Sequence, residues 1–364
     1  MLTLFLLIGV LGSCSPDLPD ADQDPANLKV EIILSQEEAG VVDIIASADH
    51  CVEFRLYIDG GDSASYINPT GIFRHTFIRS GNHLIEVRAY GLSGRYLKET
   101  RSIQVVAGDI ITIENGYKTP LSYPGYNLVW NDEFEGVAVN EQNWTFETGN
   151  GCPQLCGWGN NELQYYRREN AGVGDGVLTI EARRESIQGS GYTSARMITR
   201  NKRSFGYGRV DIRALLPKGQ GIWPALWMLG NNISTVGWPA CGEIDIMEMV
   251  GGSGRENTVH GTLHWDYQGT HAQYGGSKIR SSGTYADEYH VFTIIWDPSS
   301  IRWYVNDQHF VTADILPASM GAFHQEFFFI FNLAVGGNWP GNPNSETQFP
   351  QRMKVDYIRV FQKQ

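Results

Sequence analysis

Three carboxylates stand close together in residues 241–250, at Glu243, Asp245 and Glu248, interleaved with isoleucine and methionine. In a regular strand, successive side chains point to opposite faces, so Glu243 and Asp245 would share one face while Glu248 would point into the core. An unpaired buried carboxylate is costly. One extra residue within the pair Ile246–Met247, a β-bulge, would return Glu248 to the face of the other acids. We therefore predict a bulged strand with all three acids on one surface.

Carboxylates arranged in this way could hydrolyse a glycosidic bond. With the bulge, the two glutamate Cα atoms would lie about 13 Å apart, which leaves a gap of several ångströms between inward-leaning side chains. That gap is compatible with a retaining pair, but the sequence does not separate it from the wider gap of an inverting pair. In the retaining interpretation, Glu243 is the nucleophile and Glu248 is the general acid and then the general base. Asp245 would share a hydrogen bond or proton with a neighbouring glutamate and keep their pKa values apart.

The spacing of the acids is weak evidence by itself. Glu-x-Asp-x-x-Glu arises by chance in roughly one chain in ten of this length, and a solvated strand face is the simpler explanation. The neighbouring segments must therefore distinguish a catalytic group of acids from a solvated strand face.

The composition of the chain narrows the classes of partner. The 364 residues exceed the usual size of one hydrophobic core, so we expect two domains. The formal net charge of −12 would repel phosphate backbones and anionic headgroups, so we expect no nucleic-acid partner. The 12% of aromatic residues suit stacking on sugars, although rings filling a β-sandwich would account for most of them.

The N-terminal residues resemble an export signal. Residues 1–10 are apolar but too short to span a bilayer, and Leu-Gly-Ser-Cys14 follows them. This resembles a bacterial lipobox, in which Cys14 is acylated and becomes the first mature residue, although no Lys or Arg precedes the apolar run. We expect a signal peptide over residues 1–13 and a cell-envelope lipoprotein on the surface of the outer membrane. A lipoprotein that faces the periplasm is the alternative.

Four further cysteines suit an oxidising compartment: Cys51, Cys152, Cys156 and Cys241. Cys152 and Cys156 are near enough in sequence to bridge locally, but four cysteines permit three full pairings and the sequence does not choose among them. A zinc site is not expected, because no nearby Cys or His pair completes the Cys-x3-Cys spacing.

Alternating apolar and polar runs, separated by Gly, Asp, Asn and Ser, predict β-structure along nearly the whole chain. Residues 14–27 are rich in Asp and Pro and predict an acidic tether. Residues 28–107 predict a small immunoglobulin-like β-sandwich, within which 76–90 resembles polycystic-kidney-disease-type repeats. Residues 108–125 are interpreted as a linker, and 126–364 as a second all-β domain.

Segments on both sides of the acids carry a family resemblance. The motif Glu-Ile-Asp-Ile-Met-Glu at 243–248 follows Gly-Ile-Trp-Pro-Ala-Leu-Trp-Met-Leu-Gly at 221–230 and precedes His-Gly-Thr-Leu-His-Trp at 260–265. Together with Gly-Trp-Gly-Asn-Asn-Glu-Leu-Gln-Tyr-Tyr at 157–166, these segments resemble glycoside hydrolase family 16, the laminarinase and lichenase family. The resemblance covers about residues 126–364. It implies a concanavalin A-like jelly-roll of two bent antiparallel sheets, an open cleft on the concave side and endo attack.

The resemblance also implies substrate contacts. Trp223 and Trp227 would flank the sugar at the scissile bond, with aromatic faces against its C–H surface, although core packing is the alternative for each. His264 would lie near the acids and hydrogen-bond the leaving side of the substrate or Glu248, and His260 would share its face. A structural histidine is the alternative. Five further residues would line the cleft and contact the sugar: Asn161, Arg196, Trp238, Asn338 and Trp339.

Glu133 and Asp356 resemble positions where family members hold a structural calcium on the convex face, whereas no catalytic cofactor is expected. Solvated or hydrogen-bonded carboxylates are the alternative for both residues. The calcium would stabilise the fold.

The extra Met247 and the segment at 157–166 favour β-1,3-glucan or mixed-linkage β-1,3-1,4-glucan as substrate of a retaining endo-β-glucanase acting as a monomer. Agarose, carrageenan or xyloglucan hydrolysis is the alternative within enzymes. A non-catalytic glycan-binding or adhesive surface lipoprotein is the alternative outside them, which the intact acids disfavour.

Overall fold

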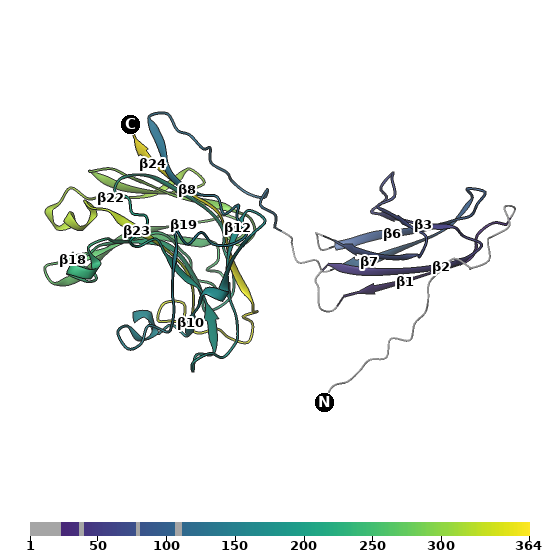
Figure 1. The fold of residues 1–364 in the computed structure, drawn as a ribbon, viewed down its shortest axis with the longest axis horizontal. Helices are drawn as coiled ribbons and strands as arrows, with labels where there is room; N and C mark the ends of the chain where they lie inside the picture. Colours follow the sequence, from purple (N-terminus) through teal and green to yellow (C-terminus); the bar gives the residue numbers. More distant parts are fainter. Residues whose placement is uncertain (1–22, 36–39, 78–80, 106–110) are drawn as a thin grey trace. The chain divides into compact units, whose positions relative to one another are not determined.

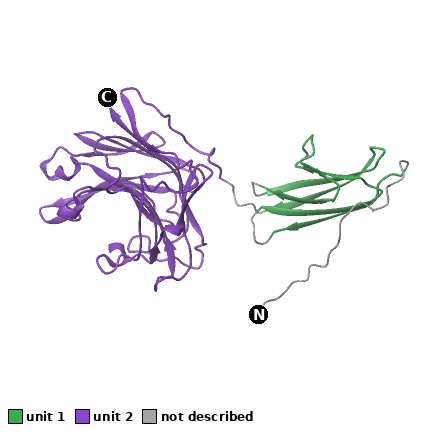
Figure 2. Cartoon of the chain, in the orientation of Figure 1, with its two compact units in different colours: residues 1–110 green, residues 111–364 purple. Residues whose placement is uncertain are grey.

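The computed structural model describes residues 23–35, 40–77, 81–105 and 111–364, and the predicted lipidation site Cys14 lies outside them. The chain divides into two compact units, residues 1–110 and 111–364 (Figure 2). In the described parts of both, no helix is long and apolar enough to cross a membrane.

The first unit is a small β-sandwich of two antiparallel sheets, with the strand orders β1-β2-β5 and β4-β3-β6-β7 (Figure 1). Alternate residues of its strands are buried, as in β2, so each sheet turns one apolar face inward. Immunoglobulin-like topology stays a prediction. The strands are β1 (Ala26–Leu34), β2 (Val41–Asp49), β3 (Glu53–Ile58), β4 (Tyr66–Asn68), β5 (Ile72–Thr76), β6 (Gly81–Tyr90) and β7 (Tyr96–Val105).

The second unit is built on two larger antiparallel sheets, which confirms the predicted all-β sandwich. The first sheet has the order β11-β12-β24-β15-β20-β21-β22, with β8 also paired to β24. The second has the order β19-β18-β17-β16-β23-β14-β9, and β10 and β13 form a separate parallel pair. The first sheet contains β8 (Tyr126–Asp132), β11 (Ala171–Gly174), β12 (Val177–Ala182), β15 (Gly208–Leu215), β20 (His290–Trp296), β21 (Ser300–Val305), β22 (Gln308–Asp314) and β24 (Gln351–Lys363). The remaining strands are β9 (Thr145–Glu147), β10 (Gln164–Tyr166), β13 (Tyr192–Ser194), β14 (Arg196–Ile198), β16 (Ile222–Gly230), β17 (Glu243–Glu248), β18 (Thr258–Tyr267), β19 (Thr270–Ile279) and β23 (Phe327–Val335). The helical segments are short: η1 (Cys156–Gly159), η2 (Arg168–Asn170), α1 (Ile233–Val236) and η3 (Ala318–Phe323).

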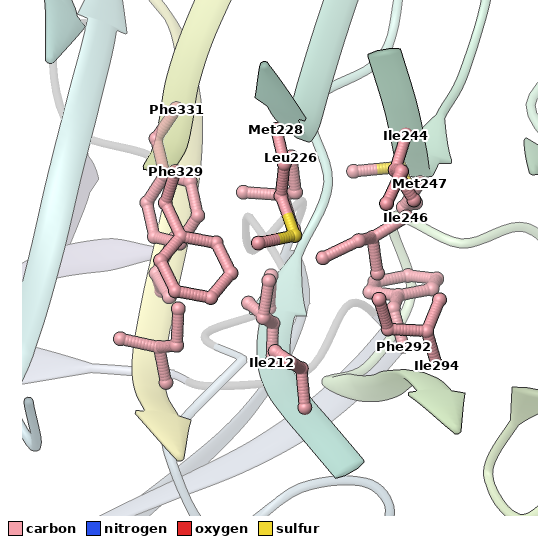
Figure 3. Close-up of a cluster of buried hydrophobic side chains, with 14 of the residues drawn as sticks. Ile212, Leu226, Met228, Ile244, Ile246, Met247, Phe292, Ile294, Phe329 and Phe331 are labelled. Atoms are coloured by element: carbon pink, nitrogen blue, oxygen red, sulfur yellow. The ribbon is translucent and has the colours of Figure 1, made fainter. Parts of the chain in front are cut away.

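The hydrophobic core of the second unit lies between its two sheets (Figure 3). Ile212 and Phe292 enter it from the eight-stranded sheet, and Leu226 and Phe331 enter it from the seven-stranded sheet. This core leaves the opposite face of the seven-stranded sheet available for polar side chains.

Strand β17 carries the predicted bulge. Leu226 of β16 pairs with Met247 and Trp227 pairs with Asp245, so Ile246 is the extra residue. The pairing with β18 is interrupted at the same place, between Asp245 and Glu248. Ile246 and Met247 are both buried in the core (Figure 3). The bulge is confirmed, and because of it the side chain of Glu248 avoids the core.

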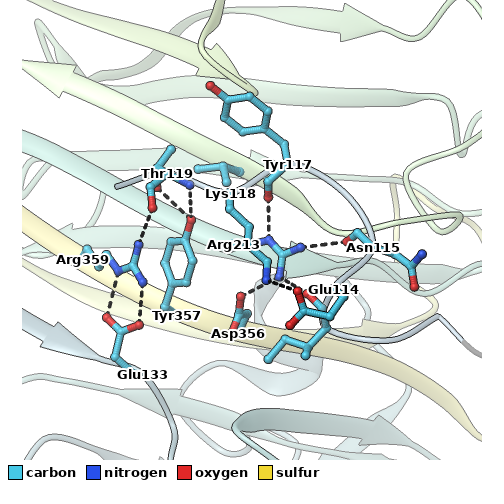
Figure 4. Close-up of polar contacts among 12 residues, drawn as sticks. Glu114, Asn115, Tyr117, Lys118, Thr119, Glu133, Arg213, Asp356, Tyr357 and Arg359 are labelled. Atoms are coloured by element: carbon cyan, nitrogen blue, oxygen red, sulfur yellow. Dashed lines mark hydrogen bonds and ion pairs between the residues drawn. The ribbon is translucent and has the colours of Figure 1, made fainter. Parts of the chain in front are cut away.

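Part of the segment interpreted as a linker packs on the second unit, which begins at residue 111. The guanidinium of Arg213 is fully buried there and donates to the carbonyls of Ile113 and Asn115, both at 2.8 Å, and of Tyr117 (Figure 4). It also donates to Asp356 Oδ2 at 2.6 Å. A buried cation with four acceptors therefore anchors this segment to the sandwich.

Candidate active site

The three acids lie together on β17, away from the core. In the register with β18, Glu243 is opposite His264 and Glu248 is opposite His260. Asp245 is buried, whereas Glu243 and Glu248 are half-buried. The sheet therefore presents a row of one buried and two accessible carboxylates, as the bulged strand predicts.

Each glutamate accepts a hydrogen bond from an indole. Trp238 Nε1 donates to Glu243 Oε2 at 2.9 Å, and Trp223 Nε1 donates to Glu248 Oε1 at 3.0 Å. A donor of this kind stabilises the ionised form of a carboxylate and fixes its orientation. Trp223 and Trp238 were predicted as sugar contacts, but their hydrogen bonds to the acids were not predicted.

Burial is the largest cause of the pKa shifts of the three acids. It raises the pKa of Glu243, Asp245 and Glu248 to about 8 in each case, and the charge of Asp245 adds to the effect at both glutamates. The indoles and the charge of His264 act in the opposite direction at Glu243 and Glu248, whereas burial is the sole cause at Asp245. The three carboxyl groups therefore disfavour simultaneous ionisation, because each is buried and the charge of Asp245 raises the pKa of both glutamates.

His264 approaches the acids from β18. Its Nε2 lies 3.1 Å from Asp245 Oδ2 and 3.7 Å from Glu243 Oε1. The angles do not make a hydrogen bond with Asp245, whose Oδ2 has no hydrogen-bond partner among the described residues. His264 therefore lies beside the acids, but the acids it approaches are Asp245 and Glu243 and not Glu248.

Three of the other residues predicted to contact sugar lie in two groups. In one, the Trp339 ring stands edge-on to Trp223 at 5.6 Å and lies 5.0 Å from His260. In the other, Asn161 Nδ2 donates to Asn338 Oδ1 at 2.8 Å. Trp339 is 44% exposed, so its ring is open to a ligand. The structure thus places these side chains near the acids or on neighbouring loops, and their contacts with sugar stay predictions.

Trp158 was not singled out from the sequence, although it lies in the Gly-Trp-Gly segment used for the resemblance. The guanidinium of Arg196 lies between the rings of Trp158 and Trp227, 4.7 and 4.9 Å from their centroids. Arg196 also pairs with Glu147, and Trp227 Nε1 donates to Asn332 at 2.7 Å. This stack fixes the face that Trp227 presents.

A disulfide between Cys152 and Cys156, one of the pairings left open by the sequence, lies just before Trp158 in the same loop. Trp158 has a positive φ of 51°, a conformation that bulky residues rarely adopt and that surrounding contacts must maintain. Its Nε1 donates to the carbonyl of Gly149 at 3.2 Å. Cys241 is a buried free thiol.

Comparison with known proteins identifies the family. The family model described as glycosyl hydrolases family 16 matches residues 157–359. The chain belongs to this family. The match runs from η1 into β24 and therefore includes β17 with all three acids.

Among the relatives of this family 16 chain is a "Beta-glucanase" of Rhodothermus marinus, 43% identical over 65% of the chain and 86% of the relative. The "Clotting factor G alpha subunit" of Tachypleus tridentatus is 42% identical over 66% of the chain, which spans only 34% of that protein's length. The solved laminarinase catalytic domain of Thermotoga maritima MSB8 is 47% identical, with a TM-score of 0.61, over 66% of the chain and 99% of that structure. These neighbours bear out the predicted jelly-roll.

The two carboxylates predicted as calcium ligands form ion pairs with arginines. Both oxygens of Glu133 accept from Arg359, at 2.8 and 2.7 Å, and Asp356 accepts from Arg213 (Figure 4). A calcium ion needs several oxygen ligands that carry net negative charge. In this arrangement the side chains do not fit a calcium site, because guanidinium groups already neutralise both carboxylates.

In the described part of the chain, the group of acids and histidines close enough to hold a metal ion is Glu243, Asp245 and His264, whose donor atoms lie within 4.8 Å of one another. Hydrolysis by a pair of carboxylates requires no metal, and one Glu243 oxygen is already bonded to Trp238. We therefore interpret the cluster through proton transfer and sugar binding.

Proposed function

We propose that this chain is a retaining, endo-acting β-glucanase that hydrolyses β-1,3-glucan, mixed-linkage β-1,3-1,4-glucan or both, by double displacement. The observation that carries the proposal is the bulge in β17, which brings Glu243 and Glu248 to one face, each with its own indole donor. Membership of family 16 and the names of the relatives, a β-glucanase and a laminarinase among them, support the substrate class.

In the first step, a carboxylate oxygen of Glu243 attacks the anomeric carbon while Glu248 gives its proton to the departing glycosidic oxygen. In the second step, Glu248 takes a proton from water, and the water oxygen displaces Glu243 from the sugar. The Trp238 hydrogen bond favours the ionised nucleophile, and burial favours the protonated acid. Asp245 would hold a proton between the two and limit repulsion between their charges. No cofactor enters this scheme.

The remaining side chains would hold the glucan. Trp223 and Trp339 present edge-on rings beside Glu248, suited to the C–H face of a sugar next to the scissile bond. Asn161 and Asn338 would bind hydroxyl groups. Because Arg196 fixes Trp227, that ring can contact sugar without losing conformational freedom on binding.

We further propose that the chain is a monomeric lipoprotein anchored through Cys14 and displayed on the outer membrane. The Leu-Gly-Ser-Cys sequence supports acylation, and an acidic tether supports display away from anionic headgroups. Labelling with a fatty-acid analogue should mark the wild-type chain and not Cys14→Ala. Equal labelling of both would contradict acylation at this residue, and protease treatment of intact cells would distinguish surface from periplasmic display.

The activity is tested by incubating the chain lacking residues 1–14 with laminarin, barley β-glucan, agarose and κ-carrageenan. We expect oligosaccharides from a glucan, released at first as β-anomers, and no product from Glu243→Gln. Glu346→Gln, an exposed glutamate in a loop, is the matched control and should keep full activity. Binding without products would contradict hydrolysis, products from galactans alone would contradict the substrate, and initial α-anomers would contradict retention.

Azide separates the two catalytic roles. With Glu243→Ala, azide should replace the nucleophile and give an α-glycosyl azide from an activated β-glucoside. With Glu248→Ala, it should attack the glycosyl-enzyme and give the β-glycosyl azide. The β-azide from Glu243→Ala and the α-azide from Glu248→Ala would instead make Glu248 the nucleophile and Glu243 the general acid/base.

A further inference from the structure

A second histidine stands behind His264 on the hairpin of β18 and β19. The register places His264 opposite Gln273 and Asp266 opposite His271, so the two histidines are diagonal neighbours on one face of the sheet. His264 Nδ1 lies 2.8 Å from His271 Nε2, and the rings are stacked with centroids 5.0 Å apart. Strand β19 is the edge of the seven-stranded sheet, and His271 is exposed there.

The same imidazole contacts Trp238. The His271 and Trp238 ring centroids are 4.8 Å apart, and those of His264 and Trp238 are 6.5 Å apart. Trp238 is 50% exposed, so little of the protein holds its ring in place. Among the described residues, the two histidines are its aromatic neighbours. His271 therefore supports the indole that donates to Glu243.

An imidazole bonded on one side only can turn about its χ2 bond and exchange its two nitrogens. His264 faces Glu243 and Asp245 with Nε2, where its angles make no hydrogen bond with Asp245. The bond at Nδ1 to His271 is thus the contact that determines which nitrogen faces the acids. Burial and the charge of His264 lower the pKa of His271, which favours a neutral partner able to donate or accept.

We infer that His271 is a positioning residue for the nucleophile: it orients His264 through a hydrogen bond and Trp238 through a ring contact, and both of these residues contact Glu243. The inference rests on the proposed hydrolase function, in which Glu243 attacks the sugar. His271 is exposed on an edge strand, so its substitution leaves the core of the sandwich intact.

Two substitutions separate the contacts of His271. His271→Phe keeps a ring beside Trp238 but removes the bond to His264, and we expect kcat on laminarin to fall about five- to tenfold with KM nearly unchanged. His271→Gln keeps a hydrogen-bonding group near the position of Nε2 but removes the ring. It should keep kcat within about twofold and raise KM about threefold, because Trp238 loses its stacking partner. His309→Phe, an exposed histidine on β22, is the control and should change neither constant.

Imidazole 15N NMR tests the histidine pair without any substrate. We expect the His264 Nδ1 resonance to move in His271→Phe and to stay in place in His309→Phe. Unchanged kcat and 15N resonances in His271→Phe, or an equal loss of kcat in His271→Gln, would overturn the inference. If the wild-type chain released no product from any glucan, the proposed function would fail, and the 15N spectra alone would then decide whether His271 orients His264.

Discussion

Removing the indole N–H groups beside the two glutamates should shift different limbs of the pH profile. Trp238→Phe and Trp223→Phe each keep an aromatic ring but delete the donor to Glu243 or to Glu248. Each N–H lowers the pKa of its glutamate, so its loss raises that pKa. The nucleophile must be ionised and the general acid must be protonated. Trp238→Phe should therefore move the acid limb of kcat/KM to higher pH and narrow the profile, whereas Trp223→Phe should move the alkaline limb to higher pH and broaden it.

The size of the shift follows from one hydrogen bond to a carboxylate. Such a bond contributes about 1.5 to 3 kcal/mol when it is protected from water, and 1.36 kcal/mol corresponds to one pKa unit. The Glu243 side chain is 16% exposed and Trp238 is half exposed, so solvent weakens this bond. We expect a shift of about one unit for Trp238→Phe and about one to two units for Trp223→Phe. The acids are coupled, so each limb reports the cluster as a whole.

The assay is kcat/KM on a soluble β-glucan oligosaccharide from pH 4 to 10. Trp339→Phe is the matched control, because its ring lies in the same group but its Nε1 bonds to neither acid in the described structure. It should change KM and leave both limbs in place. Exchange of the two limbs between Trp238→Phe and Trp223→Phe would refute the assignment of nucleophile and acid. Shifts to lower pH would refute the electrostatic argument itself.

Three further outcomes are expected. Burial raises the pKa of Asp245 from 3.8 to about 8, so its stabilising contribution is complete below about pH 4 and is lost as pH rises through about 8. In urea titrations, the free energy of unfolding of Asp245→Asn should therefore rise relative to wild type between these pH values. A difference that stays constant with pH would contradict this. Arg213→Met leaves the partly buried Asp356 without its cation and should lower the free energy of unfolding by about 3 to 5 kcal/mol, whereas Lys118→Met, an exposed control, should change it by less than about 1 kcal/mol. Arg196→Lys cannot fill the plane between two indoles and should raise KM on laminarin about five- to tenfold with kcat retained; an unchanged KM would remove Trp227 from the substrate site.

Local patterns in the sequence predicted the features that neighbouring residues determine. Because side chains alternate between the two faces of β17, a regular strand would place the Glu248 carboxylate in the core, so the sequence predicted a bulge. The structure places the extra residue at Ile246. The all-β fold follows from the same alternation repeated along the chain. The short spacing of Cys152 and Cys156 allowed their bridge, but not a choice among pairings.

Local sequence patterns did not predict contacts between segments that are distant in the chain. Glu133 and Asp356 carry the oxygens that calcium prefers, yet Arg359 pairs with Glu133 across 226 residues and Arg213 pairs with Asp356 across 143 residues. Residues 111–119 have few strand signals and were interpreted as linker, but the buried Arg213 fixes them to the sandwich.

By itself, the sequence determined which strand carries the acids and that they face the same way, because side-chain alternation depends only on adjacent residues. Only the tertiary structure decided which groups control them. Trp223 and Trp238 reach Glu248 and Glu243, and His271 reaches His264, through the register and loops that bring separate segments together. The protonation of a carboxylate depends on every dipole and charge within a few ångströms, and chain folding sets those distances.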